Sequence, residues 1–385
     1  MKEVLSVLLW VSFLLILYTY ALYPFLLLLI TRPQNSQKDV QSKKNVPSVT
    51  ILISAHNEEQ VISQRISNLK ELDYPKEKLQ VLIGSDGSTD GTNALMTKAK
   101  TSHIKLVTFQ QRRGKAAVLN DLMTQARGEI VIFSDANTIF DPGVVKRLVR
   151  HFSDPQVGAV SGELRLETDR RSVGGVGESF YWQYETLVKR LESRFASLVG
   201  ATGGVYAIRK SLFEPLPIGK SVNDDFVIPL HILKKGYRVV YEPEAVAFEH
   251  VAGSVRGEFK RKVRIGAQNF ASVWLVKDML HPKKGFPAFA LWSHKILRWC
   301  VPFFLIILFS SSLALSLYDD SYRSLFWAHV VFWGLVVIGF TAEQIDWNIG
   351  VGGFPYYFVA MNAALFVGFI KFLAGVHTAA WEVTR

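Results

Sequence analysis

The stretch Leu82-Ile-Gly-Ser-Asp-Gly-Ser-Thr-Asp90 passes directly from an apolar run to small and acidic residues. Such a change is typical of a buried strand that ends in a tight turn before a helix. Ile132-Phe-Ser-Asp-Ala-Asn137 repeats the pattern. Because ligands of open α/β sheets bind beyond the carboxyl ends of the strands, we expect Asp86 and Asp135 to face one cleft. Carboxylates in such a cleft suit a metal-bound, phosphate-bearing ligand.

Apolar runs alternate with helical patterns on both sides of this stretch. The runs cover residues 49–53, 79–83, 104–109 and 130–133, and the helical patterns cover 59–72, 92–100 and 116–126. Strands that alternate with helices form a parallel sheet with right-handed crossovers. The sequence therefore predicts an α/β, Rossmann-like domain with a mostly parallel sheet.

Both ends of the chain are hydrophobic, which explains a mean hydropathy of +0.18 and an apolar content of 49%. Residues 4–30 are almost free of charge and exceed the ~20 residues that span a bilayer. They are expected to be a transmembrane anchor, because a cleaved signal peptide would be shorter and would end in a small-residue cleavage site. Further candidate spans are 299–318, 325–340 and 354–376. The middle one is short enough to be re-entrant or tilted instead.

Basic residues on both flanks of the central segment predict that this segment is cytoplasmic and, if all four spans cross the membrane, that both termini lie outside. They are Arg32, Lys38, Lys43 and Lys44 before it and Lys283, Lys284, Lys295 and Arg298 after it. These basic residues beside the expected spans account for much of the net charge of +11. Because their position is explained by the nearby membrane, no nucleic-acid partner is expected. The single cysteine, Cys300, excludes an intramolecular disulfide framework.

Two more motifs complete an ordered set: Ser54-Ala-His-Asn-Glu58 before the two strand exits, and Ser221-Val-Asn-Asp-Asp-Phe226 after them. From about Pro47 to Trp274 this order resembles the family 2 glycosyltransferases with the GT-A fold, in particular the membrane-integral members related to bacterial polysaccharide synthases. The resemblance implies that the first strand exits and a basic residue at a helix start hold the nucleotide of a sugar donor. The residues in those positions are Ala55, Asn57, Glu58, Asp86, Lys115 and Asp135. A solvated helix start is the alternative role for Lys115.

Asp135-Ala-Asn137 takes the place of the family's DxD motif, which binds Mg2+ or Mn2+ at the diphosphate. The resemblance thus implies metal ligands at Asp135 and Asn137. Since asparagine offers only a neutral oxygen, the metal should bind more weakly than at two carboxylates.

The resemblance makes Asp225 the general base that deprotonates an acceptor hydroxyl, with Asp224 as its supporting neighbour. Alternatively, these acids could only cap a helix. Gly200-Ala-Thr-Gly-Gly204, which includes Gly203, is similar to the family's glycine-rich turn near the acceptor.

Arg261-Lys-Val-Arg-Ile265 stands where processive synthases carry QxxRW. Arg261 and Arg264 are expected to contact the diphosphate or acceptor, although the segment could also be a basic helix lying on anionic lipid. The missing Trp puts processive polymer synthesis in doubt, unless Trp182 or Trp274 replaces it.

An apolar stripe with helical spacing lies upstream, at Phe180, Tyr184, Leu187, Leu191, Phe195 and Leu198. Core packing is the role we expect for it, with a surface for a lipid acceptor as the alternative.

We therefore expect an inverting glycosyltransferase, transferring a hexosyl or N-acetylhexosaminyl group from a UDP-type nucleotide-sugar donor. The acceptor would be a saccharide or a lipid-linked molecule at the cytosolic face of the cell (inner or plasma) membrane, in cell-surface or exopolysaccharide or glycolipid synthesis. Single-sugar, non-processive transfer to a lipid is the nearest alternative. A nucleotidyltransferase or an inactive membrane scaffold are alternatives from other classes.

The expected division of this multi-pass protein follows the same motifs. It consists of an anchor (1–31), a basic linker (32–46), the GT-A domain (47–255), basic membrane-interface helices (256–298) and a membrane region of about three spans (299–385).

Overall fold

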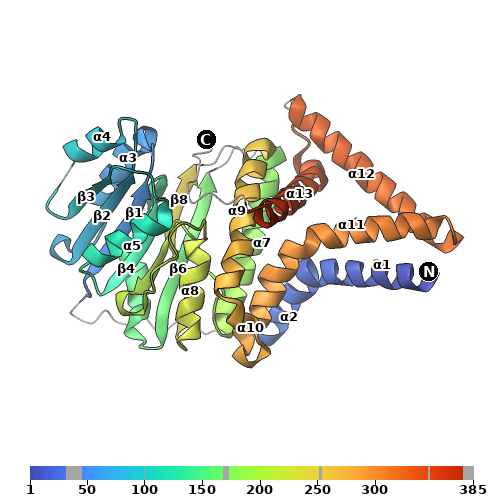
Figure 1. Ribbon diagram of the computed structural model, residues 1–385, viewed down its shortest axis with the longest axis horizontal. Helices are drawn as coiled ribbons and strands as arrows, with labels where there is room; N and C mark the ends of the chain where they lie inside the picture. Colours follow the sequence, from blue (N-terminus) through green and yellow to red (C-terminus); the bar gives the residue numbers. More distant parts are fainter. Residues whose placement is uncertain (32–45, 100, 168–172, 251–253, 346, 376–385) are drawn as a thin grey trace.

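The computed structural model describes residues 1–31, 46–99, 101–167, 173–250, 254–345 and 347–375. An eight-stranded sheet with the order β3-β2-β1-β4-β7-β6-β8-β5 forms one end of the molecule (Figure 1). The strands are β1 (Val49–Ala55), β2 (Leu79–Asp86), β3 (Ile104–Phe109), β4 (Ile130–Asp135), β5 (Thr138–Phe140), β6 (Val157–Glu167), β7 (Tyr206–Arg209) and β8 (Arg238–His250).

The four strands predicted from the sequence form a continuous parallel block at one edge of the sheet. β3, β2, β1 and β4 pair in parallel, and β6 is parallel to β8. β7 runs antiparallel to β4 and β6, and β5 runs antiparallel to β8. The α/β prediction is confirmed, with a mixed sheet.

Helices bury both faces of this sheet. They are α3 (Glu59–Lys70), α4 (Thr92–Lys98), α5 (Lys115–Gln125), α6 (Val144–Val149) and α8 (Asp224–Lys234). Along β1, Ile51 and Ile53 enter one core and Leu52 enters the other, as the two-residue period of a strand requires. Burial on both faces explains why these strands are continuous apolar runs.

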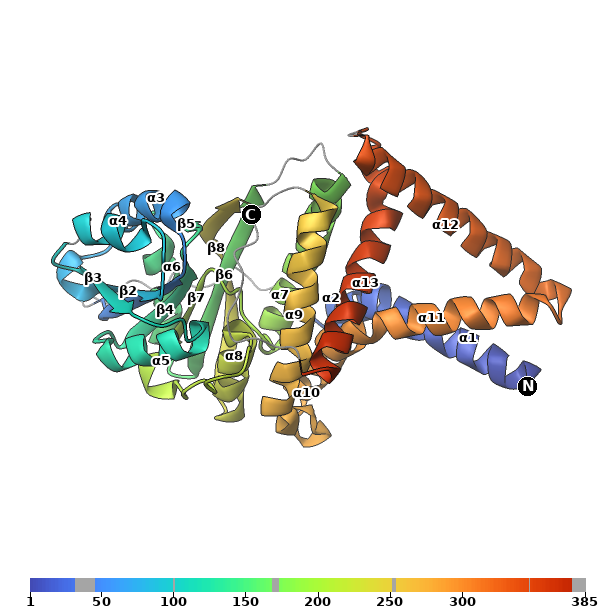
Figure 2. The same ribbon diagram turned by 45° about the horizontal axis from the view of Figure 1, so that its top comes forward.

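Long helices connect the sheet domain to the apolar helices. α7 (Val173–Phe195) and α9 (Val255–Leu275) stand beside the sheet, with the short α10 (Phe286–Ala290) below them (Figure 2). Arg261 of α9 forms an ion pair with Glu178 of α7 (2.7 Å), which connects the two helices. It also forms an ion pair with Glu258 of its own helix (2.7 Å).

Four helical segments are long and apolar enough to cross a membrane: Lys2–Ile30, Phe286–Ser316, Asp320–Gln344 and Gly350–Leu373. The first contains α1 (Lys2–Leu17), the π-helical turn η1 (Tyr18–Leu22) and α2 (Tyr23–Ile30), and the second contains α10, the π-helical turn η7 (Leu291–Ile296) and α11 (Leu297–Ser316). α12 (Arg323–Gln344) belongs to the third segment, which has 25 residues, so it is not too short to span as the sequence suggested. α13 (Phe354–Leu373) forms most of the fourth. The predicted linker, apart from residue 46, lies outside the described residues.

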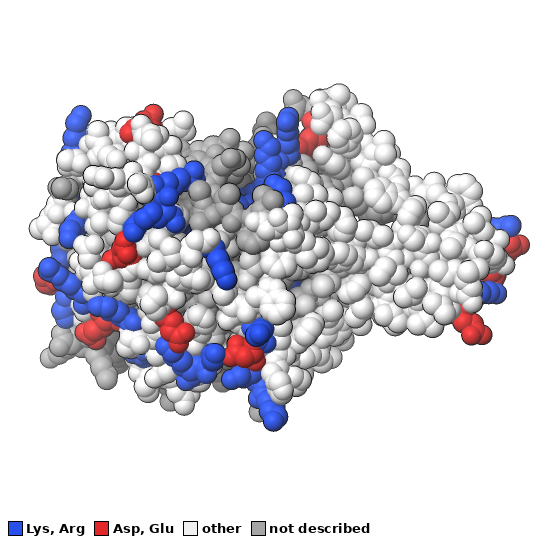
Figure 3. Space-filling model, in the orientation of Figure 1, with Lys and Arg blue, Asp and Glu red and all other residues white. Residues whose placement is uncertain are grey.

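α1 and α11 extend together away from the sheet domain (Figures 1 and 2). Lys2 pairs with Asp319 at their far end, 2.7 Å apart. In the view of Figure 3, charged side chains cover the sheet domain and this far tip, while the surface between them is almost free of charge. That uncharged band matches the hydrocarbon layer of a membrane.

A buried polar cluster joins the first helical segment to the remainder of the molecule. The Tyr23 hydroxyl of α2 donates to Glu192 Oε1 of α7 at 2.7 Å. His294 Nδ1 lies 2.8 Å from the same oxygen, and His294 Nε2 lies 3.1 Å from Glu185 Oε2. The cluster therefore fixes α2, α7 and η7 to one another.

Candidate active site

Asp86, at the end of β2, is fully buried and holds the loop before α5. Its carboxylate oxygens accept hydrogen bonds from the backbone N–H groups of Arg113 and Gly114, each 2.8 Å long. Gly114 has φ 90°, a conformation that favours glycine, and is the N-cap of α5. Asp86 thereby fixes the start of α5, whose first residue is Lys115.

The motif at residues 54–58 connects the loops that follow β1 and β2. Asn57 Oδ1 accepts from the backbone N–H of Thr89 at 2.9 Å, and the backbone N–H of Glu58 donates to Thr92 Oγ1 at 2.8 Å. Ala55 is buried at the end of β1. The residues predicted to hold the nucleotide thus lie at neighbouring strand exits, where their polar groups also hold the loops together.

Lys115 bridges two of the predicted acids. Its Nζ lies 2.8 Å from Asp135 Oδ1 and 3.0 Å from Asp224 Oδ1. Burial opposes the charge, yet Asp135 and Asp224 raise the pKa of Lys115, so the ammonium group remains protonated. The alternative of a solvated helix start does not hold.

Asp224 and Asp225 begin α8 and have different surroundings. Asp224 is buried, and its Oδ2 accepts from the Tyr206 hydroxyl at 2.7 Å. Asp225 lines a pocket, and a Cβ on Gly203 would lie 3.1 Å from its Oδ2. Burial and the neighbouring Asp224 raise the pKa of Asp225 to about 7. This carboxyl can therefore exchange a proton near neutral pH.

Asp135 and Asn137 lie beside a third acid that the sequence analysis missed. Asn137 Nδ2 donates to Glu249 Oε1 of β8 at 2.9 Å. Burial, with the nearby charge of Asp135 as a smaller cause, raises the pKa of Glu249. Its position follows from the antiparallel pairing of Thr138 with Glu249, which no local motif signals.

These oxygen groups fit a hard divalent cation such as Mg2+ or Mn2+. Within the described ranges, no three His, Cys, Asp or Glu side chains are grouped closely enough to hold a metal ion. A cation at Asp135 and the amide oxygen of Asn137 would therefore need further ligands from substrate phosphates.

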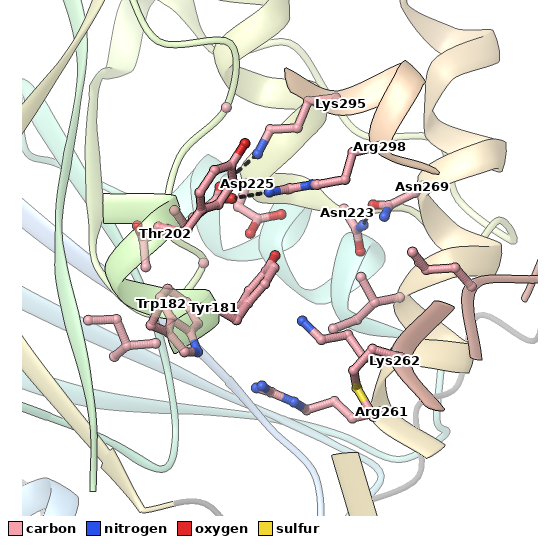
Figure 4. A pocket seen from close by; sticks show the side chains of 18 of the residues that line it. Tyr181, Trp182, Thr202, Asn223, Asp225, Arg261, Lys262, Asn269, Lys295 and Arg298 are labelled. Atoms are coloured by element: carbon pink, nitrogen blue, oxygen red, sulfur yellow. Dashed lines mark hydrogen bonds and ion pairs between the residues drawn. The ribbon is translucent and has the colours of Figure 1, made fainter. Parts of the chain in front are cut away.

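A pocket of about 760 Å³ extends from Asp135 and Asp225 to α13. Gly203, Arg261 and Arg264, which are predicted to lie at the diphosphate or acceptor, line this pocket. Figure 4 shows Tyr181, Arg261 and Lys262 pointing into the space near Asp225. The described residues include no hydrogen-bond or ion-pair partner for Arg264, whereas Arg261 is bound to Glu178 and Glu258.

The two tryptophans that could replace the missing Trp, Trp182 and Trp274, lie in different places. Trp182 lines the pocket, whereas Trp274 is 65% exposed at the end of α9 and does not line it. Of the two aromatic residues that could replace the missing Trp, only Trp182 can contact a bound sugar there.

The expectation that the apolar stripe of α7 packs in the core is wrong for half of its members: Phe180, Leu187 and Phe195 are exposed. The polar residues Glu178, Glu185, Lys189 and Glu192 are buried instead. Their helical spacing was the signal that the sequence analysis passed over.

Several of the missed polar residues line the pocket. Glu185 accepts from Lys295 at 2.8 Å and from Arg298 at 2.6 Å (Figure 4). Burial opposes its ionisation, but these cations hold the pKa of Glu185 well below its usual range. Lys189 donates to Thr202 at 2.9 Å, and burial lowers its pKa.

The chain is similar to known proteins along most of its length. Residues 50–216 match the model of the glycosyl transferase family 2. Poly-beta-1,6-N-acetyl-D-glucosamine synthase of Staphylococcus aureus (strain COL) is 29% identical over 270 residues, which cover 68% of this chain and 64% of that protein. The synthase of the same name from Staphylococcus epidermidis is 24% identical over 354 residues, which cover 91% of this chain and 77% of that protein.

A solved structure has the same fold over almost the whole chain. It is the mannosyltransferase PcManGT from Pyrobaculum calidifontis in complex with GDP-Man and Mn2+, with a TM-score of 0.73 and 22% identity. The match covers 97% of this chain and 98% of that one, so the apolar helices are part of the shared architecture. Together with the strand exits described above, these matches show that the chain carries a glycosyl transferase family 2 domain with the GT-A fold.

Proposed function

We propose that the protein is an inverting glycosyltransferase that takes a hexosyl or N-acetylhexosaminyl group from a UDP-type nucleotide sugar. The observation that carries this proposal is Asp225, a pocket carboxyl whose pKa is raised to about 7 beside Lys115 and Asp135. A base with this pKa suits removal of a hydroxyl proton at neutral pH. The name of the staphylococcal relatives supports an N-acetylhexosaminyl donor.

The reaction is a single displacement at the anomeric carbon. The bond from that carbon to the diphosphate oxygen breaks, and its electron pair leaves with the nucleoside diphosphate. The acceptor oxygen forms the new bond, and its proton passes to Asp225. Lys115 and Arg264 stabilise the negative charge on the leaving group.

Asp135 and Asn137 would hold a divalent cation, Mg2+ or Mn2+, with Glu249 behind Asn137. When bound, the cation neutralises charge on the departing diphosphate. Mn2+ in the structure of the mannosyltransferase from Pyrobaculum calidifontis supports this assignment.

The acceptor is a saccharide or a lipid-linked molecule at the membrane face. The apolar helices support a multi-pass location in the cell membrane, with the sheet domain in the cytoplasm.

Release of UDP from a panel of nucleotide sugars by the detergent-purified full chain tests the proposal. We expect release from at least one UDP-hexose or UDP-N-acetylhexosamine, and a large loss of release in the Asp225→Asn variant. Pyrophosphate release would instead indicate a nucleotidyltransferase. Release of neither product from any donor would indicate a scaffold and overturn the proposal.

A further inference from the structure

α13 lies against the sheet-domain side of the molecule at both of its ends. A Cβ on Gly353, just before α13, would be 2.5 Å from Cγ1 of Val173 at the start of α7. A Cβ on Gly368, near the end of α13, would be 2.7 Å from the carbonyl oxygen of Val263 in α9. α13 thus follows α9, and both views show α1 and α11 extending away from this pair (Figures 1 and 2).

α12 also returns to this side. It begins near the charged tip, and Glu343 at its other end accepts a hydrogen bond from the backbone N–H of Val255 at 2.8 Å. The chain therefore reaches the far tip at Asp319 and comes back before α13 begins. Length and composition would let α13 cross a membrane, but its contacts keep it beside α7 and α9.

α13 forms an apolar wall of the pocket that contains Asp225. The wall residues from this helix are Phe354, Phe358, Met361 and Leu365. The pocket reaches the protein surface at Phe180 and Phe354, whose rings are 6.0 Å apart and which are 45% and 42% exposed. An exposed apolar mouth suits a hydrocarbon chain rather than a hydrated sugar.

Cationic side chains lie in the pocket together with this apolar wall and Asp225. Lys262, Lys295 and Arg298 line it, and Glu185 binds the last two. Lys262 lies 4.0 Å from the centre of the Tyr181 ring and 3.5 Å from Glu258. The pocket thus offers a base, cationic groups and an apolar wall, which suit the head, an anionic linkage and the tail of an amphiphile.

We propose that the acceptor is a lipid with an anionic linkage, whose reacting hydroxyl lies at Asp225 and whose hydrocarbon chain lies along α13. In this arrangement α13 stays on the catalytic side of the membrane and does not cross it. The inference rests on the proposed function and specifies its acceptor. It departs from the staphylococcal relatives, whose name indicates a polysaccharide product.

Product partition tests the acceptor. Membranes that contain the full chain would be incubated with a radiolabelled UDP-sugar found active by UDP release, and the products would be separated between chloroform–methanol and water. We expect the label in the organic phase and bound to an anion-exchange column. A labelled lipid that passes through that column would overturn the anionic linkage. UDP release with water-soluble label alone would overturn this inference and leave the proposed function intact. No UDP release from any donor would instead refute the function.

A matched pair of α13 variants tests whether the apolar wall of the pocket binds a hydrocarbon chain. Leu365 lines the pocket, whereas Ile370 of the same helix is 49% exposed and does not line it. Leu365→Gln should lower the label recovered in the organic phase roughly tenfold, because it places a polar group where the hydrocarbon chain would lie. Ile370→Gln should leave the label in the organic phase unchanged. Equal effects of both variants on lipid transfer would contradict a chain-binding wall.

Thiol labelling tests the position of α13, since Cys300 is the only cysteine in the sequence. In a Cys300→Ser background, single cysteines would be placed at Leu317, at the far tip, and at Leu373, at the end of α13, both of which are exposed. A membrane-impermeant maleimide should label Leu317→Cys on intact cells, and Leu373→Cys only after permeabilisation. Labelling of Leu373→Cys on intact cells would show that α13 crosses.

Discussion

Replacement of Asp225 by asparagine tests the proposed base most directly. The described residues include no hydrogen bond to the Asp225 side chain, so asparagine should fit without disturbing the pocket. A positioned general base contributes about 10²–10⁴-fold to rate, which is about 2.7 kcal/mol or more. We therefore expect kcat for transfer to fall by about 10²-fold or more, with little change in the affinity for UDP.

The pH profile gives the same test an independent readout. Asp225 must be ionised to act as a base, and its pKa in the folded protein is raised to about 7. The wild-type kcat/KM should therefore fall about tenfold for each pH unit below about 7 and be level above it. Asp225→Asn should lack this acid limb. In Asp224→Asn the limb should move to lower pH, because Asp224 is a cause of the raised pKa.

Thermal unfolding separates chemistry from folding. A carboxyl whose pKa rises on folding favours the folded state only when protonated, so ionised Asp225 costs stability once the pH exceeds its unfolded pKa. Asp225→Asn should therefore unfold at the same or a higher temperature than wild type at pH 8. Near-normal turnover in Asp225→Asn, with turnover abolished in Asp224→Asn, would refute the assignment of these roles.

Three further predictions concern the metal, the donor and the product. Activity should require Mg2+ or Mn2+, and Asn137→Asp should bind the ion as tightly or more tightly, because it adds a charged oxygen; full activity in excess EDTA would contradict a metal at Asp135. Lys115→Met should weaken UDP binding in calorimetry and shift the acid limb of the pH profile upward, because Lys115 lowers the pKa of Asp225. Wild type should make single-sugar or short products on gel sizing, and Ile265→Trp should change their length rather than the KM for the donor.

The part of the fold that could be predicted from the sequence is the parallel block β3-β2-β1-β4. β1, β2 and β4 are short apolar runs because nearly all of their residues are buried, whereas β3, at the edge of the sheet, buries only Ile104 fully. β8 was missed because Glu242-Pro-Glu244 interrupts it with polar residues and a proline. β7 has only four residues, and its place between β4 and β6 depends on contacts distant in sequence.

The residues of the site also fall into two groups: those that a local motif predicts and those that only contacts distant in sequence bring into the site. Asp86, Asp135 and Asp225 follow or begin regular elements, so their motifs predicted their common edge. Glu249 joins Asn137 only through strand pairing, 112 residues further along the chain. Lys189 is buried because it enters the pocket and donates to Thr202 in the loop before β7, a contact that no local motif signals.

The hydrogen bond from Tyr23 to Glu192 limits how the enzyme can be re-engineered. A generic apolar helix in place of the native first segment would anchor the chain but would remove a donor from a buried carboxylate. Glu192 would keep His294 and lose the Tyr23 hydroxyl, and a hydrogen bond to a charged group contributes about 1.5–3 kcal/mol. The loss would fall on α7, the helix that carries Tyr181, Glu185 and Lys189 into the pocket. In a truncated form made for solubility, the part of α7 that lines the pocket would lack the hydrogen bond from Tyr23. We therefore expect this form to differ from the full chain in acceptor binding.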